Sequence, residues 1–139
     1  MTTTTLTNHQ ARARADYLNI ALWTFQGWIA MFFIAAGYAK LSEPMENLIV
    51  LMQWPAAAGE AFVRGLGVAE IVLAAMVLAP LVSWRFGRPL LLTAAAGLLI
   101  LESIALGVHA FGLDLGLSLS LTNVFLIAIT APVLWLRRR

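Results

Sequence analysis

The sequence lacks cysteine entirely and contains few charged residues. Without cysteine, the chain cannot form disulfides, carry out thiol redox chemistry, or bind zinc or an iron–sulfur cluster through thiolates. Charged residues make up 12% of the chain, whereas soluble domains contain about a quarter. Hydrophobic residues make up 61%. This composition is typical of an integral membrane protein, in which any redox role would require a bound cofactor.

Motifs for metals, haem and nucleotides are also missing from the sequence. A di-metal four-helix bundle uses Glu-x-x-His pairs from two helices, and the chain has none. Two histidine ligands for haem are not expected, because His109 lies in an apolar segment and His9 lies in the N-terminal tail. No phosphate-binding loop, nucleophile elbow or metalloprotease motif is present. We therefore expect neither a metal nor a haem cofactor.

Four apolar segments each approach the ~20 residues that cross a ~30 Å hydrocarbon core. They are predicted at residues 18–39, 62–82, 90–109 and 117–136. Residues 1–17 form a polar, threonine-rich tail, which we expect to be cytoplasmic. The sequence therefore predicts an all-α fold, an integral membrane four-helix bundle that forms a single domain over residues 1–139.

The distribution of basic residues predicts the orientation of the chain. Seven of the nine lie in the tail, between the second and third segments, or after the fourth; the other two are Lys40 and Arg64. Because short cytoplasmic loops carry an excess of Lys and Arg, both termini are expected in the cytoplasm. The basic residues flank apolar segments instead of forming one patch, so we do not expect nucleic acid to bind.

The connection between the first two spans, SEPMENLIVLMQWP, has a helical pattern. Met45, Leu48, Ile49 and Met52 recur at helical spacing. The pattern predicts a short amphipathic helix in the outer membrane interface, with Trp54 as an anchor. The alternative is a loop whose apolar residues cap the bundle.

Polar residues inside the predicted spans lie at matching depths. With a rise of 1.5 Å per residue, Glu70 lies about 9 Å inward of Arg64, and Glu102 about 10 Å inward of His109. Other polar residues expected near this level are Lys40 at the end of the first span and Asn123 in the fourth. The polar groups are therefore expected to cluster in the outer half of the bundle.

Helical phase places several of these residues on shared faces. Glu102 and His109 are seven residues apart and lie on one face of the third span. In the first span, Gln26 and Gly37 lie on one stripe, and Gly37 leaves room beside it. Small residues such as Gly65 and Gly67 in the second span allow helices to pack closely. Each span thus offers a face that a bundle can turn inward.

Carboxylates at mid-span require a specific explanation. Each costs about 2.5–3.5 kcal/mol on insertion scales, so Glu70 and Glu102 must be paired, be protonated or face water. We interpret both as proton-handling residues. The residues predicted to contact a ligand are Lys40, His109, Asn123, Arg64, Gln26, Gly37 and Gly67. The alternative is a structural role, in which carboxyls bonded across helices fix the packing.

Two stretches, AGYAKL (Ala36–Leu41) and GLGVAEIVLAAMVLAP (Gly65–Pro80), resemble the DoxX family of small four-span bacterial membrane proteins. That family ends its first span with a Gly-x-x-Lys-Leu-like element and carries Gly-x-x-Glu in the second span, before an apolar run ending in proline. The matching positions here are Gly37, Lys40, Leu41, Gly67, Glu70 and Pro80. The resemblance covers most of residues 20–136.

This resemblance implies a four-helix bundle in the bacterial cytoplasmic membrane and an association with redox systems. Members of the family have been linked to quinone-reducing, thiosulfate-oxidising complexes and to membrane assemblies for oxidative-stress defence. The expected cofactor is therefore a quinone. The expected partners are the lipid bilayer, a membrane redox subunit and, as a further option, a second copy of the chain.

The leading functional hypothesis is a DoxX-like subunit that binds a quinone or a similar apolar ligand in a cavity in the outer half of the bundle. Glu70 and Glu102 would move protons, while Lys40 or His109 would donate a hydrogen bond to a carbonyl. The chain would then be at most an oxidoreductase-associated subunit. Two alternatives remain: a proton-coupled small-molecule exporter, and a non-catalytic accessory subunit of a membrane complex.

Overall fold

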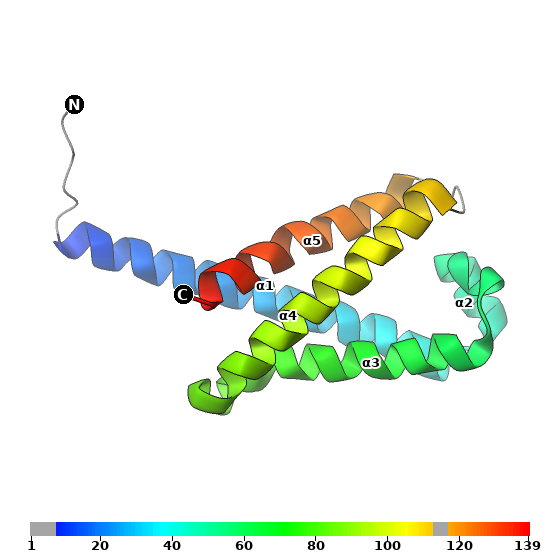
Figure 1. The fold of residues 1–139 in the computed structure, drawn as a ribbon, viewed down its shortest axis with the longest axis horizontal. Helices are drawn as coiled ribbons and strands as arrows, with labels where there is room; N and C mark the ends of the chain where they lie inside the picture. The colour runs from blue at the N-terminus through cyan, green and yellow to red at the C-terminus, as the bar shows by residue number, and fades with distance from the viewer. Residues whose placement is uncertain (1–7, 113–116) are drawn as a thin grey trace.

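The computed structural model of the protein describes residues 8–112 and 117–139, and its regular elements within those ranges are all helical (Figure 1). The predicted all-α fold is therefore confirmed. The five longer helices are α1 (Asn8–Ser42), α2 (Met45–Met52), α3 (Glu60–Leu78), α4 (Trp84–Gly107) and α5 (Leu117–Arg137). Three short helical segments connect them: η1 (Trp54–Ala57), η2 (Ala79–Leu81) and the π-helical η3 (Val108–Gly112).

Four segments within the described ranges are long and apolar enough to cross a membrane. They are Asn8–Ser42, Glu60–Leu81, Trp84–Phe111 and Leu119–Arg137. These segments confirm the four predicted spans. Residues 113–116, which belong to the predicted turn between the last two spans, lie outside the described residues.

Two helices begin earlier than predicted. α1 begins at Asn8, so the described part of the predicted tail is helical, and its 35 residues extend about 52 Å. Residues 1–7 lie outside the described ranges. α4 begins at Trp84 instead of near residue 90, with Pro89 as its sixth residue. Proline at this position removes the hydrogen bond from its own nitrogen to the Arg85 carbonyl, and its ring crowds that carbonyl. Pro89 lies close to the start of α4, so the rest of the helix keeps its regular hydrogen bonds.

The four spanning helices form a closed ring. α1 packs against α3, α3 against α4, α4 against α5, and α5 against α1. The start of α1, the end of α5 and the α3–α4 connection lie at one end, and α2, the end of α4 and the start of α5 lie at the other (Figure 1). Following the orientation predicted from the basic residues, we call these the inner end and the outer end.

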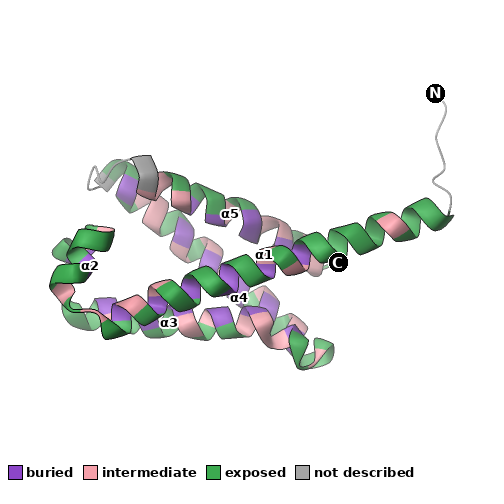
Figure 2. Ribbon diagram, turned by 180° about the vertical axis from the view of Figure 1, so that it is seen from behind, coloured by how far each residue is buried: buried purple, intermediate pink, exposed green. Residues whose placement is uncertain are grey.

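Apolar side chains occupy both the interior and the exterior of the ring. The core includes Phe33, Ala74, Leu98, Leu126 and Val133. Exposed residues run along the outward faces of the helices (Figure 2). Many of them are large and apolar, including Met31, Val72, Ile100 and Phe125. Apolar side chains on the exterior suit contact with lipid chains. The helices also satisfy their own backbone hydrogen bonds, as a chain in the hydrocarbon core must. The chain is therefore a multi-pass membrane protein.

α2 confirms the predicted short helix between the first two spans. Leu48 is fully buried, whereas Val50 is 80% exposed, so the helix is amphipathic. Pro44 precedes its first turn. Gln53 ends it with a φ of 62° and donates its backbone N–H to the Ile49 carbonyl at 2.9 Å. The alternative of an irregular loop is therefore wrong.

Candidate ligand-binding site

α1 and α3 cross where two glycines meet. A Cβ atom at Gly37 would lie 2.6 Å from the Gly67 carbonyl oxygen, and one at Gly67 would lie 2.9 Å from the Gly37 carbonyl oxygen. Only residues without a side chain allow the two backbones to approach so closely. Both glycines were predicted to contact a ligand, but they form this helix contact, and neither lines the cavity described below.

The glycine contact brings a lysine and a glutamate together inside the bundle. Lys40, one turn after Gly37, reaches across to Glu70, one turn after Gly67. Lys40 Nζ lies 2.7 Å from Glu70 Oε2 and 3.0 Å from Oε1. The two residues are only 4% and 7% exposed. The positive charge of Lys40 therefore compensates the negative charge of Glu70, which explains how a carboxylate is accommodated within α3.

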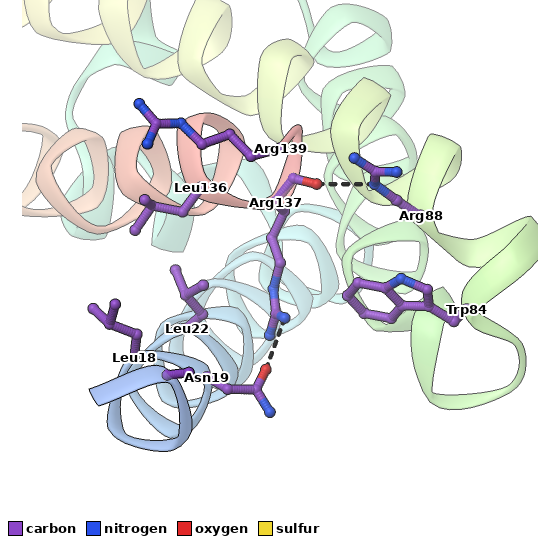
Figure 3. Close-up of a pocket in the computed structure, with 9 residues that line it drawn as sticks. Leu18, Asn19, Leu22, Trp84, Arg88, Leu136, Arg137 and Arg139 are labelled. Atoms are coloured by element: carbon purple, nitrogen blue, oxygen red, sulfur yellow. Dashed lines mark hydrogen bonds between the residues drawn. The ribbon is translucent and has the colours of Figure 1, made fainter. Parts of the chain in front are cut away.

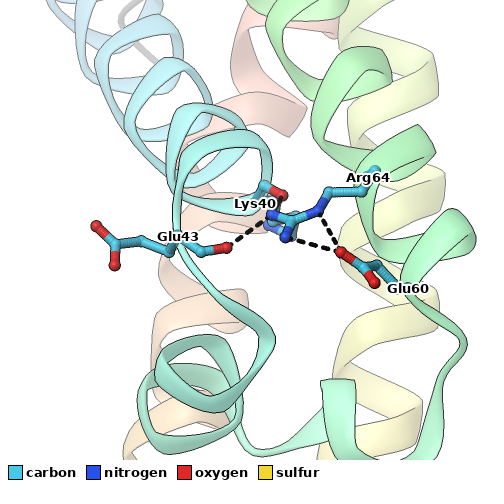
Figure 4. A network of polar contacts seen from close by, with 4 residues as sticks. All are labelled: Lys40, Glu43, Glu60 and Arg64. Atoms are coloured by element: carbon cyan, nitrogen blue, oxygen red, sulfur yellow. Dashed lines mark hydrogen bonds and ion pairs between the residues drawn. The ribbon is translucent and has the colours of Figure 1, made fainter.

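Arg64 holds the end of α1 that carries this lysine (Figure 4). Its Nη1 donates to the backbone carbonyl of Lys40 and, at 2.8 Å, to that of Glu43. Its Nε and Nη2 donate to Glu60 Oε1 at 3.3 Å and 3.0 Å. Carbonyls in the last turn of a helix lack hydrogen-bond donors within that helix, and the guanidinium of Arg64 provides such a donor. Arg64 was predicted as a ligand contact, but it positions α1 and does not line the cavity.

A cavity of about 500 Å³ lies in the outer half of the bundle. Side chains from α1, α3, α4, η3 and α5 contribute polar groups to its lining. Thr122 is one of these residues, and the other five are Lys40, Glu70, Glu102, His109 and Asn123. These five were predicted from the sequence, and the structure brings them into one cavity.

Aromatic side chains form much of the remaining wall. Phe32 and Phe33 come from α1, Trp54 from η1, and Phe62 from α3. The Trp54 and Phe62 rings meet edge to face, with centroids 6.4 Å apart and an interplanar angle of 84°. Sequence reasoning missed these residues as parts of a site and assigned Trp54 only an anchoring role. In a membrane protein, apolar side chains that face a cavity and those that face lipid have the same composition.

Glu102 differs from Glu70 in its surroundings. It is 4% exposed, and its Oε2 has no hydrogen-bond partner among the described residues. It lies close enough to Glu70 and Lys40 to interact electrostatically with both. Buried polar atoms are usually satisfied, so an unpartnered carboxyl oxygen beside a cavity is a candidate contact for a ligand.

His109 and Asn123 form a second polar pair in the cavity wall. His109 lies in the π-helical turn η3, a type of turn that is frequent at functional sites. Asn123 Nδ2 lies 2.7 Å from His109 Nδ1. When the amide donates this bond, Nδ1 is the acceptor, and Nε2 carries the proton of the neutral ring. His109 then presents a single N–H donor.

We predict that this bond selects one tautomer of His109. In protein labelled with ¹⁵N-histidine, His109 should show a protonated Nε2 and an unprotonated Nδ1. Replacing Asn123 with leucine should give a mixture of both tautomers, because the donor to Nδ1 is removed. His9→Gln serves as the control, since it removes the only other histidine signal. A protonated Nδ1 in the neutral ring of the unmodified protein would contradict the assignment.

Gln26 lies on the predicted inward face of α1 but outside the cavity. It is fully buried on the face that also carries Gly37 and Lys40. Its Nε2 donates to the Val77 carbonyl at 3.2 Å, and its Oε1 accepts a bond from Arg137 Nε at 3.0 Å. Fourteen residues separate Gln26 from Lys40, which is about 21 Å along a helix. The structure therefore does not bring Gln26 into the candidate site.

Comparison with known proteins places this arrangement in a family. No curated protein and no solved structure matches the chain. The model of the DoxX-like family matches residues 24–133, which include both glycines of the helix contact and all the polar residues that line the cavity. The chain therefore belongs to the DoxX-like family.

Proposed function

We propose that the cavity binds a quinone, or a similar apolar molecule with ring carbonyls, as part of a membrane redox system. The main support is the combination of aromatic walls with polar groups from three separate elements, Lys40, Glu102 and His109. The volume of about 500 Å³ falls within the roughly 300–1,000 Å³ typical of ligand pockets. The redox association implied by the DoxX resemblance agrees with such a ligand.

Two donors in the cavity are suited to carbonyl oxygens. A lysine ammonium has three N–H donors, and the two oxygens of Glu70 accept bonds from Lys40. One lysine N–H is thus left to point at a ligand. His109 contributes its Nε2–H when Asn123 donates to Nδ1. A ring with carbonyls on opposite sides could accept one bond from each donor.

Glu102 is the better proton donor of the two glutamates. Glu70 is held by Lys40, whereas Glu102 Oε2 has no partner in the described part of the chain. Reduction of a quinone to a quinol takes up two electrons and two protons. In our proposal a redox partner would supply the two electrons. Protonated Glu102 would give one proton to a reduced ring oxygen and, after taking up a second proton from water, would give that proton to the ring as well. Glu70 sets the local charge through its pairing with Lys40.

Filling the cavity should weaken ligand binding. We expect Ala105→Phe, in the cavity wall, to weaken binding of a short-chain ubiquinone by about tenfold or more, because the added ring occupies ligand space. Ala69→Phe is the matched control, since Ala69 is exposed on α3. Binding can be measured by titration of detergent-solubilised protein, together with mass spectrometry of quinone extracted from the purified protein. Equal binding by both variants would remove the support for this site.

A second pair of variants separates binding from proton transfer. Glu102→Gln should keep quinone binding within about threefold, because the amide has a similar shape, but should slow proton-coupled reduction in membranes. Glu60→Gln makes the same chemical change at an exposed carboxyl outside the cavity and should leave reduction unchanged. If no quinone binds, and Glu102 is instead required for proton-driven uptake of a substrate into liposomes, the exporter hypothesis replaces this one.

A further inference from the structure

A second pocket lies at the inner end of the bundle, opposite the ligand cavity. It has a volume of about 410 Å³ and is bounded by the first half of α1, the start of α4 and the end of α5. Figure 3 shows Arg137 reaching from α5 toward Asn19 on α1, with the Trp84 ring beside its guanidinium. Arg88 of α4 lies on the other side of the α5 terminus.

The contacts of the Arg137 side chain within the described residues are all with neutral groups. Its Nη1 donates to Asn19 Oδ1 at 2.8 Å, and its Nε donates to Gln26 Oε1 at 3.0 Å. Its guanidinium carbon lies 5.2 Å and 5.0 Å from the ring centroids of Trp23 and Trp84. Nη2 is buried and has no hydrogen-bond partner among the described residues. The contacts orient the positive charge but do not neutralise it.

Arg88 adds a second uncompensated charge to this pocket. Its Nε and Nη2 donate to the backbone carbonyls of Arg137 and Arg138 at 2.9 Å and 2.7 Å. Asp16, the nearest acidic residue along α1, does not line the pocket. Both salt bridges found in the described ranges lie at the outer end. Three arginines, Arg88, Arg137 and Arg139, thus line a pocket that has no carboxylate side chain in its lining. Partly buried charges of this kind require a counter-ion.

We propose that this pocket binds the phosphate group of an anionic phospholipid. Arg137 and Arg88 supply the charge, and Asn19 and Trp84 hold the guanidinium of Arg137 in place. A guanidinium fork matches the geometry of phosphate oxygens. Basic pockets between spanning helices at the cytoplasmic side are suited to lipid phosphates, and the basic residues predict that the inner end is the cytoplasmic one.

The apolar part of the lining favours a lipid over a free phosphate ion. Leu18, Leu22 and Leu136 line the same pocket as the three arginines. Leu18 is 44% exposed on the lipid-facing side of α1, where an acyl chain could run along the helix. A free phosphate would gain nothing from these side chains, whereas a phospholipid would bury its glycerol and upper chain against them.

The test measures lipid binding by native mass spectrometry and by titration in detergent. The purified full chain is titrated with dioleoyl-phosphatidylglycerol and, separately, with dioleoyl-phosphatidylcholine and inorganic phosphate. We expect the phosphatidylglycerol to bind at least about tenfold more tightly than the other two, and Arg137→Gln to lose that preference. Arg85→Gln is the matched control, because Arg85 is exposed near the same end of α4 and does not line the pocket.

A charge-preserving variant separates lipid binding from folding. Arg137→Lys keeps the positive charge and should retain a preference for phosphatidylglycerol, with all variants compared at equal helical content. Unchanged phosphatidylglycerol binding in Arg137→Gln would overturn the proposal, as would equal loss in Arg85→Gln. Tight binding of inorganic phosphate that displaces the lipid would show a free-anion site instead. None of these results depends on quinone binding at the outer cavity.

Discussion

Replacing Lys40 with methionine should lower the free energy of unfolding by about 3–5 kcal/mol, the range measured when one partner of a buried ion pair is removed. Lys40 and Glu70 are almost completely buried, and their charged atoms are 2.7 Å apart. Methionine fills a similar space but leaves the Glu70 carboxylate without a counter-charge in an apolar interior. Unfolding in mixed detergent micelles, followed by circular dichroism, measures the change.

The double variant Lys40→Met, Glu70→Met tests whether charge is the cause. Apolar pairs of similar volume often replace buried ion pairs at little cost, so the double variant should regain most of the lost stability. Glu60→Gln is the control, because Glu60 pairs with Arg64 near the surface, and such pairs contribute less than about 1 kcal/mol. If the double variant is as unstable as Lys40→Met, the lysine acts through packing, and the charge argument is wrong.

The sequence was sufficient to predict which polar residues meet. Glu70, Glu102 and Asn123 belong to different spans, but alternating span direction and a constant rise per residue place them at one depth. Helical phase then turns them inward. Both arguments depend only on helix geometry, which apolar spans follow closely. For this reason the cavity contains five of the seven polar residues that were expected there, without Arg64 and Gln26.

Residues whose partners depend on detailed packing were predicted less well. Gln26 shares the inward face of α1 but lies about 21 Å from Lys40 along the helix. Its helix face alone therefore did not predict whether it lines the cavity. The Arg64 side chain is long enough to reach either the cavity or the end of α1, and it bonds to the carbonyls of α1. Helical phase does not show which of several backbone groups a flexible guanidinium will contact.

The sequence also did not predict which of two similar small residues forms the helix contact. Gly65 and Gly67 both precede Glu70 and both suit a close helix contact. In the structure only Gly67 touches α1, while Gly65 has open space around it. Two residues correspond to about 200° around a helix, so the crossing angle of α1 and α3 decides which glycine is covered. That angle results from packing along the whole interface.

Replacing Gly37 with alanine should destabilise the protein by about 2 kcal/mol, within the range of about 1–3 kcal/mol for overpacked cores. Alanine is the better helix former by up to about 1 kcal/mol, so intrinsic helix propensity alone predicts the opposite sign. The new methyl group would lie 2.6 Å from the Gly67 carbonyl oxygen and 2.7 Å from Ile71 Cγ1. A backbone carbonyl cannot move aside as a flexible side chain can, so α1 and α3 must separate.

Gly65→Ala makes the same change on α3, where no atom lies within 4 Å of the added carbon, and it should be neutral or slightly stabilising. The two variants can be compared by thermal unfolding in the same detergent. Separation of α1 and α3 should also lengthen the Lys40–Glu70 pair and shift one wall of the cavity, so Gly37→Ala should weaken quinone binding while Gly65→Ala does not. Equal stability of the two variants would show that the glycine contact does not determine how closely α1 and α3 pack.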